Sequence, residues 1–401
     1  MISILTLCCC LGAEPEVVVK PLRGEPLQGA LVELSATRLT LRAGGQTRQF
    51  ETSGLESFRP VGSATPDAAD QAQVWVELVD GSAFAGATFT AAAGQCTMTG
   101  GATGTLSMSL PRVRSVRFYA PQEQIRAQWK AIAAESAPGD VLVIRKISSS
   151  ASGASEVALD QLTGVVHGVT DATVSFEFDG ERLDVSRAKI EGIVLRGATS
   201  RETDEPYSRV RDAAGGIWNA RDVSFGDGRL ELTTVAGVRV PLPWNQVQEV
   251  DYSAANLMHL AEIEMESAAW RPYFQSSLTP KSLSRWFEPR FEAVALGGRS
   301  YDRSLVLHSR SVVSYRLSRN FRQLVAVVGI DERLRHQANL GLTILGDGQP
   351  LFQRTIRGDQ EPFELDLPID GVRRLRIEVD FGEDRSDVGD LLYLAEPRLV
   401  K

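Results

Sequence analysis

The sequence has very little cysteine. Only four of its 401 residues are cysteine, and Cys8, Cys9 and Cys10 stand together near the start, which leaves Cys96 alone in the rest of the chain. If the first residues are removed as a signal peptide, Cys96 alone remains and can form no internal disulfide, so hydrophobic packing must hold the folded parts together. The strand-like alternation around Cys96 indicates a small core residue.

Histidine is equally scarce. The four histidines are His167, His259, His308 and His336, and none stands at a spacing typical of zinc ligands. A Gly-x-Ser-x-Gly elbow, a phosphate-binding loop and a dinucleotide fingerprint are also absent. We therefore predict a protein that is not an enzyme. Hydrolysis of a glycosidic bond stays open as an alternative, because the chain has 51 Asp and Glu residues from which a pair of carboxylates could come.

The chain lacks an excess of positive charge and lacks long apolar runs. Its net charge is -8, with 43 Lys and Arg against 51 Asp and Glu. A nucleic-acid partner needs a basic face, so we predict none. No run approaches the ~20 apolar residues that cross a membrane, so we predict no transmembrane span.

The first residues are apolar and end in small residues. Met1 to Ala13 resembles a secretory signal peptide, although no Lys or Arg precedes Lys20. We expect an exported protein that is periplasmic or extracellular. A buried first strand is the alternative for this segment.

A chain of this length predicts several domains. Between Glu14 and Tyr252 the same ending recurs four times: a polar turn, a short bridge and one last strand. We predict four small β units over residues 14–62, 70–119, 139–197 and 205–252. In the last three endings one apolar residue precedes another by three positions, the first expected in a one-turn helix and the second opening a strand: Val113 and Val116, Ile190 and Ile193, Val247 and Val250.

A hairpin precedes each ending. Asp80-Gly81, Asp179-Gly180 and Asp227-Gly228 suit turns that require positive φ. Short strands with a one-turn helix before the last resemble SH3-like or Sm-like barrels. Between the second and third units, apolar residues recur at helical spacing from Pro121 to Ala137, which predicts a linking helix within residues 120–138.

The last third, residues 257–401, consists of short apolar or alternating runs closed by Gly, Asp, Asn or Pro. This pattern predicts an antiparallel β-sandwich of jelly-roll type. The expected fold class is therefore all-β, with tandem small barrels, one linking helix and a C-terminal sandwich.

The same third also resembles a known family. Tyr301, His308-x-x-Ser311, Tyr315-x-Leu317, Val328-Gly-x-Asp331 and a final strand ending in Pro397-Arg-Leu399 follow one another as in NPCBM, a carbohydrate-binding module associated with glycosyl hydrolase family 98. The resemblance implies a galactose-binding-like sandwich that binds glycan. A sugar needs an aromatic face and nearby polar groups, for which we take Trp286, Tyr301, His308 and Tyr393 as candidates. Each of them has a core role as its alternative.

Galactose-binding-like sandwiches often hold a structural calcium, so the resemblance also draws attention to Asp384, Asp387 and Asp390. A solvated acidic loop is the alternative, and no other cofactor is expected. The leading hypothesis is an exported, non-catalytic protein that binds glycan or envelope polysaccharide, with other envelope proteins as a second class of partner. The alternatives are a protein-interaction scaffold whose module has lost sugar binding, and an accessory subunit of a polysaccharide-degrading system.

Overall fold

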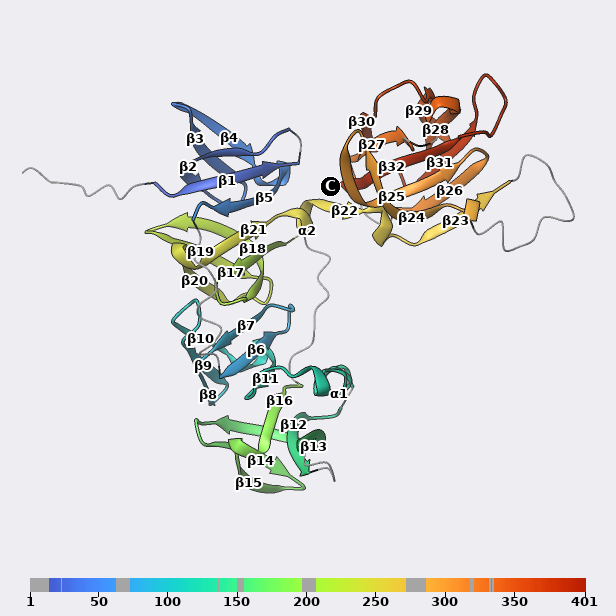
Figure 1. The fold of residues 1–401 in the computed structure, drawn as a ribbon. Coiled ribbons are helices and arrows are strands. Elements are labelled where there is room, and N and C mark those ends of the chain that lie inside the picture. Colours follow the sequence, from blue (N-terminus) through green and yellow to red (C-terminus); the bar gives the residue numbers. More distant parts are fainter. Residues whose placement is uncertain are drawn as a thin grey trace, which may run out of the picture. The chain divides into compact units, whose positions relative to one another are not determined.

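The computed structural model describes residues 14–22, 24–62, 73–135, 137–149, 155–196, 207–271, 286–317, 321–331, 333 and 335–401. The expected segment Met1–Ala13 lies outside these residues. The chain forms two compact units, Met1–Ala255 and Asn256–Lys401, and both are built almost entirely of antiparallel strands (Figure 1). The predicted all-β class is thus confirmed.

The first unit contains four strand groups. Group 1 consists of β1 (Glu16–Pro21), β2 (Leu27–Leu34), β3 (Arg38–Ala43), β4 (Gln46–Glu51) and β5 (Leu55–Pro60). Group 2 consists of β6 (Val74–Leu78), β7 (Ala83–Gly86), β8 (Thr88–Ala92), β9 (Gln95–Thr99), β10 (Thr105–Ser109) and β11 (Val113–Arg117), where β7 and β8 share the role of one interrupted strand.

Group 3 consists of β12 (Asp140–Ser149), β13 (Ser155–Val169), β14 (Thr173–Phe178), β15 (Glu181–Ser186) and β16 (Ile190–Val194). Group 4 consists of β17 (Ser208–Asp212), β18 (Ile217–Gly226), β19 (Arg229–Thr234), β20 (Arg239–Pro243) and β21 (Val247–Asp251).

All four groups share one topology. The last strand pairs with the first, and the remaining strands pair with one another in chain order. In group 1 this gives the order β5-β1-β2-β3-β4. Among the described residues, no ladder joins the fourth strand to the last, so each group is an open sheet and not a closed barrel. The likeness to SH3-like barrels stays a prediction.

A one-turn helix precedes the last strand of each group, as predicted. These helices are Thr52–Gly54, Leu110–Arg112, Arg187–Lys189 and Trp244–Gln246. The expected position was wrong by three residues, because Val113, Ile190 and Val247 begin the last strand itself. Each of these three side chains is fully buried in the core, as expected for an inward-facing residue of a strand.

The groups join edge to edge into one sheet system. The last strands pair at two seams, β5 with β21 and β11 with β16. Groups 2 and 4 meet where Ile217 pairs with Ala83, and the Phe84 and Trp218 rings stack 4.1 Å apart. The order in space is therefore group 3, 2, 4, 1 (Figure 1). One apolar core runs through all four groups.

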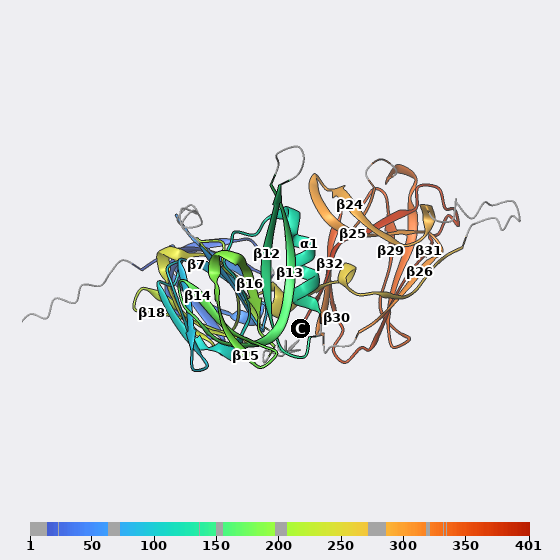
Figure 2. The same ribbon diagram turned by 90° about the horizontal axis from the view of Figure 1, so that it is seen from below.

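The predicted linking helix is α1 (Glu123–Ala134). Ile125 and Trp129, one turn apart, are its buried residues. Figure 2 shows α1 lying along β12 and β13, where Trp129 joins Val141, Val143 and Val194 in a small apolar cluster of its own. Group 3 carries valine on this outer face, which explains why the helix covers it.

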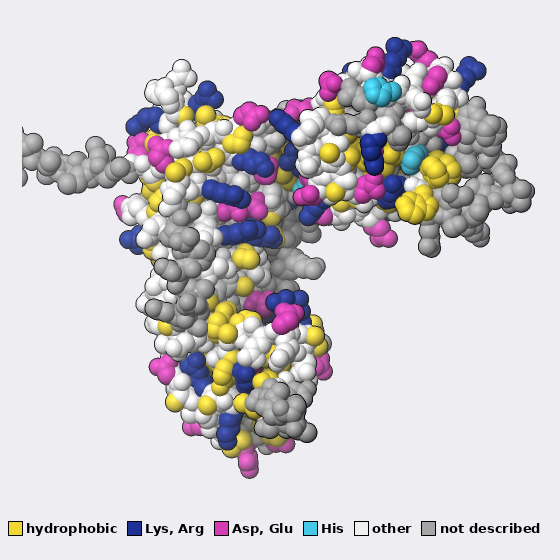
Figure 3. Space-filling model, in the orientation of Figure 1, with side chains coloured by type: hydrophobic (Ala, Val, Ile, Leu, Met, Phe, Trp, Pro, Cys, Tyr) yellow, Lys and Arg dark blue, Asp and Glu magenta, His cyan; other side chains and the backbone are white. Residues whose placement is uncertain are grey.

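The outer surface of the first unit is mixed in charge. Figure 3 shows dark blue and magenta side chains interleaved over it. Many are paired, such as Lys20 with Glu56 at 2.5 Å and Arg59 with Glu249 at 2.6 Å. Within the described residues, no helix combines the length and apolar character that crossing a bilayer requires.

The second unit begins in the short helix α2 (Ser253–Asn256), which spans the unit boundary, and is a two-sheet sandwich. One sheet runs β24 (Arg290–Leu296), β25 (Arg299–His308), β32 (Leu391–Val400), β27 (Gln323–Ile330) and β30 (Phe363–Pro368), with β22 (Leu257–His259) also beside β32. The other runs β23 (Met265–Trp270), β26 (Ser311–Arg316), β31 (Arg374–Phe381), β28 (Asn339–Gly346) and β29 (Gln349–Arg357). Two one-turn helices, Leu260–Glu262 and Arg335–Gln337, complete it.

The sandwich core follows from strand alternation. Inward residues such as Leu305, Leu307, Leu342, Ile344 and Ile377 are fully buried between the sheets. The predicted C-terminal antiparallel sandwich is confirmed.

Candidate functional site

Antiparallel pairing gathers several strand ends at one end of the sandwich. His308 ends β25 opposite Leu391, which opens β32. Asp331 follows β27 and its backbone amide donates to the Leu391 carbonyl. In the other sheet, Trp270 ends β23 opposite Ser311. Side chains distant in sequence thus meet at this end.

An aromatic cluster forms there. The Trp270 and Phe287 rings stack with centroids 4.6 Å apart, and Phe287 meets the His308 ring edge-on at 4.8 Å. Trp286, next to Phe287, leaves 71% of its surface exposed. Phe287 therefore anchors the segment while its neighbour projects an indole into solvent.

His308 is a neutral imidazole at pH 7. Its half-buried position lowers its pKa to about 4, mainly through desolvation and further through the positive charge of Arg290, with Asp387 opposing. A neutral imidazole has one nitrogen that donates and one that accepts. His308 is thus able to bond two hydroxyl groups at once.

Arg290 fixes the backbone that presents Trp286. Its Nη1 donates to the Trp286 carbonyl at 2.7 Å and its Nε donates to Glu292 at 3.0 Å. Residues 286 to 292 are thereby tied together by one guanidinium.

Tyr393 lies beneath this surface and not on it. Its side chain is 1% exposed, and its hydroxyl lies 3.3 Å from both Glu292 and Asp331. Asp331 in turn accepts two bonds from Arg333, at 2.6 and 3.0 Å, and these bonds lower its pKa. Tyr393 therefore supports the end of the sheet from within.

Comparison with known families gives a match for this unit: the NPCBM/NEW2 domain model covers residues 261–400. Residues 261–400 are an NPCBM/NEW2 domain. The resemblance seen in the sequence is confirmed. A comparison with curated proteins gives no match.

Solved structures similar to this chain are carbohydrate-binding modules. One is CBM51 from Clostridium perfringens GH95 in complex with methyl-galactose, with 21% identity, 36% of this chain and 99% of that chain covered, and a TM-score of 0.29. Another is the tandem CBM51 modules of the family 98 glycoside hydrolase Sp3GH98 from Streptococcus pneumoniae, with 11% identity, 82% and 88% covered, and a TM-score of 0.30. At such TM-scores the likeness supports no conclusion about a ligand.

Within the NPCBM/NEW2 domain, the structure separates the four predicted sugar-binding residues. Trp286 and His308 lie at the same end. Tyr301 lies seven residues before His308 on β25, about 23 Å away at ~3.3 Å per residue, where it packs beside Val294. Tyr301 and the buried Tyr393 therefore do not share the surface of Trp286 and His308.

The acidic loop of the domain places the three candidate calcium ligands in different surroundings. Asp390 is 3% exposed, accepts from the Asn339 amide at 2.9 Å and from the Ser309 hydroxyl, and has its pKa raised to about 6 by burial. Asp384 and Asp387 are exposed. Among the described residues, no group of three or more such side chains is placed to hold a metal.

Trp270, Phe287 and Arg290 were not among the predicted site residues. Trp270 and Phe287 stand in a sequence segment without clear period, and Arg290 has no motif. Only the pairing of β23 with β26 and of β24 with β25 brings them beside His308.

Proposed function

We propose that the NPCBM/NEW2 domain binds glycan at the strand ends that carry Trp286 and His308, and that the protein is a non-catalytic, exported binder of envelope polysaccharide. One observation carries the proposal: Trp286, which is 71% exposed, directly precedes Phe287, whose ring packs on Trp270 and meets the His308 imidazole edge-on.

The chemistry suits a saccharide. The exposed Trp286 ring offers a flat apolar face for the C–H groups of a pyranose. His308 donates to one hydroxyl and accepts from another. Because Phe287 and Trp270 hold the His308 ring in place before a ligand arrives, little ordering cost remains for binding.

The carboxylates at this end support a binding role over a hydrolytic one. Glu292 is paired with Arg290, and Asp331 with Arg333. Both carboxylates also lie within reach of the Tyr393 hydroxyl. A general acid needs a raised pKa and contact with the substrate, whereas the pKa of Asp331 is lowered by its arginine. Asp390, whose pKa is raised, is 3% exposed and is bonded to Ser309 and Asn339.

Export rests on the sequence of Met1–Ala13 alone. A mature protein that begins near Glu14 in the native host would support it, whereas intact Met1 in the soluble cytosolic fraction would contradict it.

Binding is tested on a glycan array with the full chain. We expect Trp286→Ala and His308→Ala each to weaken the best glycan about fivefold or more, which corresponds to ~1 kcal/mol. Tyr301→Phe is the control, because Tyr301 lies far along the same strand. A wild-type protein that binds no glycan, or variants that bind as tightly as wild type, would refute the proposal.

A further inference from the structure

A groove lies in the first unit, outside the NPCBM/NEW2 domain. It has a volume of about 260 Å³ and lies between group 2, α1 and a turn of group 4. The residues that matter to its chemistry are Trp75, Glu77, Phe84, Ser115, Arg117 and Trp129.

Strand register places the aromatic and polar side chains side by side. Trp75 pairs with Arg117 across β6 and β11, and Glu77 pairs with Ser115 one step along. Alternation puts all four on the same face of the sheet. A half-buried indole therefore lies directly beside a guanidinium, with a carboxylate and a hydroxyl next to them.

The walls of the groove are rigid without a ligand. Phe84 is stacked on Trp218 across the junction of groups 2 and 4. The Arg117 guanidinium lies 4.8 Å from the Trp129 ring and donates to the buried Glu191 through Nε at 3.2 Å and Nη2 at 2.6 Å. Neither wall depends on an occupant for its position.

The polar groups keep capacity for further bonds. The two Arg117 bonds to Glu191 use Nε and Nη2, which leaves Nη1 with donor capacity on a residue that lines the groove. Glu77 has only long contacts, 3.3 Å to Arg114 and 3.3 Å to the Ser115 hydroxyl. A carboxylate has about four acceptor positions, so most of its capacity is unused.

We propose that this groove is a second saccharide-binding site. It joins an aromatic face to one strong donor and one strong acceptor, the combination that vicinal hydroxyls on a pyranose ring satisfy. The opposite charges of Arg117 and Glu77 favour a neutral ligand over an anion or a cation. At ~30 Å³ per water, the groove has room for about nine waters, which suits one sugar ring.

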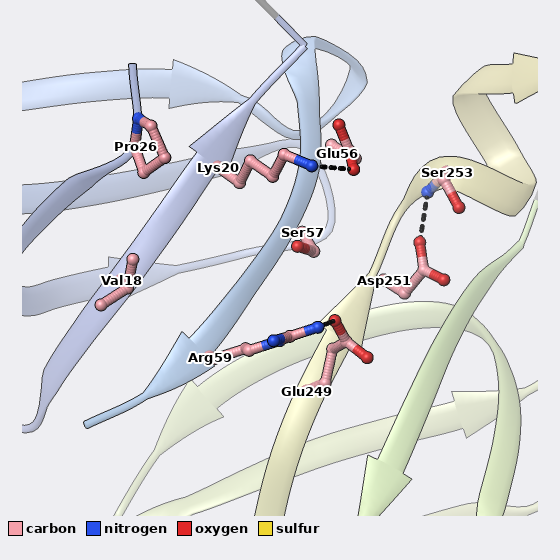
Figure 4. A pocket seen from close by; sticks show the side chains of 9 residues that line it. All are labelled: Val18, Lys20, Pro26, Glu56, Ser57, Arg59, Glu249, Asp251 and Ser253. Atoms are coloured by element: carbon pink, nitrogen blue, oxygen red, sulfur yellow. Dashed lines mark hydrogen bonds and ion pairs between the residues drawn. The ribbon is translucent and has the colours of Figure 1, made fainter. Parts of the chain in front are cut away.

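A comparison within the same unit shows that volume alone does not make such a site. The groove in Figure 4 is of similar size, about 270 Å³, and lies at the seam of groups 1 and 4. It has no aromatic lining residue, and its charged groups bond one another, Lys20 with Glu56 and Arg59 with Glu249. We infer no ligand there.

The test uses the full chain and a glycan array. Trp286→Ala/His308→Ala first weakens binding at the NPCBM/NEW2 domain. We expect this double variant to retain glycan binding, and we expect Trp75→Ala added to it to lower that residual affinity at least tenfold. Glu77→Gln keeps the side-chain size and should lower the residual affinity as well. It serves as the second variant should Trp75→Ala disturb the fold.

The control is Arg209→Ala, since Arg209 occupies in group 4 the strand position that Trp75 occupies in group 2. Residual binding that Trp75→Ala and Glu77→Gln leave unchanged would overturn the inference. A double variant that binds nothing while wild type binds would overturn it too, but would leave the proposed function of the domain intact. A wild-type protein that binds no glycan would overturn both.

Discussion

The buried charge of Glu191 offers a sharp test of how groups 2 and 3 are held together. Glu191 is 0% exposed on β16 and faces two arginines, Arg117 from β11 at 2.6 Å and Arg145 from β12 at 3.3 Å. Both arginine side chains are at most 10% exposed. Replacing Glu191 with Gln keeps the shape but leaves two buried cations without their anion.

The expected cost is large. Breaking a buried ion pair by removing one partner costs about 3–5 kcal/mol, because the remaining charge stays desolvated. We therefore expect Glu191→Gln to lower the free energy of unfolding of the first unit by about 3 kcal/mol or more. Urea unfolding of the full chain, followed by tryptophan fluorescence, measures it through the shift of the midpoint at constant m.

A matched control lies at the other seam. Glu249 pairs with Arg59 across β21 and β5, but the Arg59 side chain is 67% exposed. Glu249→Gln should therefore cost under about 1 kcal/mol, as exposed pairs do. Replacing Glu191, Arg117 and Arg145 together with apolar residues should cost less than Glu191→Gln alone. A loss below about 1 kcal/mol for Glu191→Gln, or a triple variant that is the least stable, would refute this reasoning.

Two groups of the NPCBM/NEW2 domain should titrate in opposition. The Asp390 pKa is raised to about 6, so the contribution of Asp390 to stability is present at low pH and is lost as pH rises from ~4 to ~6. The His308 pKa is lowered to about 4, so the contribution of His308 is present at neutral pH and is lost as pH falls from ~6.5 to ~4. Each of these two contributions is about 3 kcal/mol at 1.36 kcal/mol per pH unit, so they offset one another and the stability of the wild type should be nearly flat from pH 4 to 6. Asp390→Asn should lose stability toward pH 4, and His308→Ala should lose stability toward pH 6. Parallel curves of stability against pH for the wild type and both variants would contradict this. Trp129→Ala should destabilise the first unit by ~3 kcal/mol or more because the ring is 7% exposed under α1, and an unchanged thermal midpoint would show that α1 is not packed there. Trp286→Ala should change the free energy of unfolding of the domain by less than ~0.5 kcal/mol because its ring is exposed, and a clear destabilisation would place the indole in the core.

Periodicity in the sequence predicted the elements well. The alternation in residues 257–401 and the recurring endings at Val116, Ile193 and Val250 record which side of each strand is buried, and burial of one side leaves a readable pattern in the sequence. The linking helix was equally readable, since Ile125 and Trp129 lie one turn apart.

The candidate site was only half predictable. Trp286 and His308 were found from residue type and from the family resemblance. The burial of Tyr393 and the distance of Tyr301 were not. The first depends on which side chains pack around Tyr393 on β32, and the second on the position of Tyr301 along β25. The bracing role of Phe287 and Arg290 depends on pairings between distant strands that no local pattern records.

The pairing of β5 with β21 has a consequence for synthesis. Phe58 of group 1 lies opposite Val250 of group 4, a separation of 192 residues. At a synthesis rate of about 5–20 residues per second, the last strand of group 1 waits roughly 10–40 s for its partner. An open strand edge invites pairing with other chains during that interval. Arg59, on β5 itself, places a positive charge at this edge and acquires its acidic partner, Glu249, only in the finished fold.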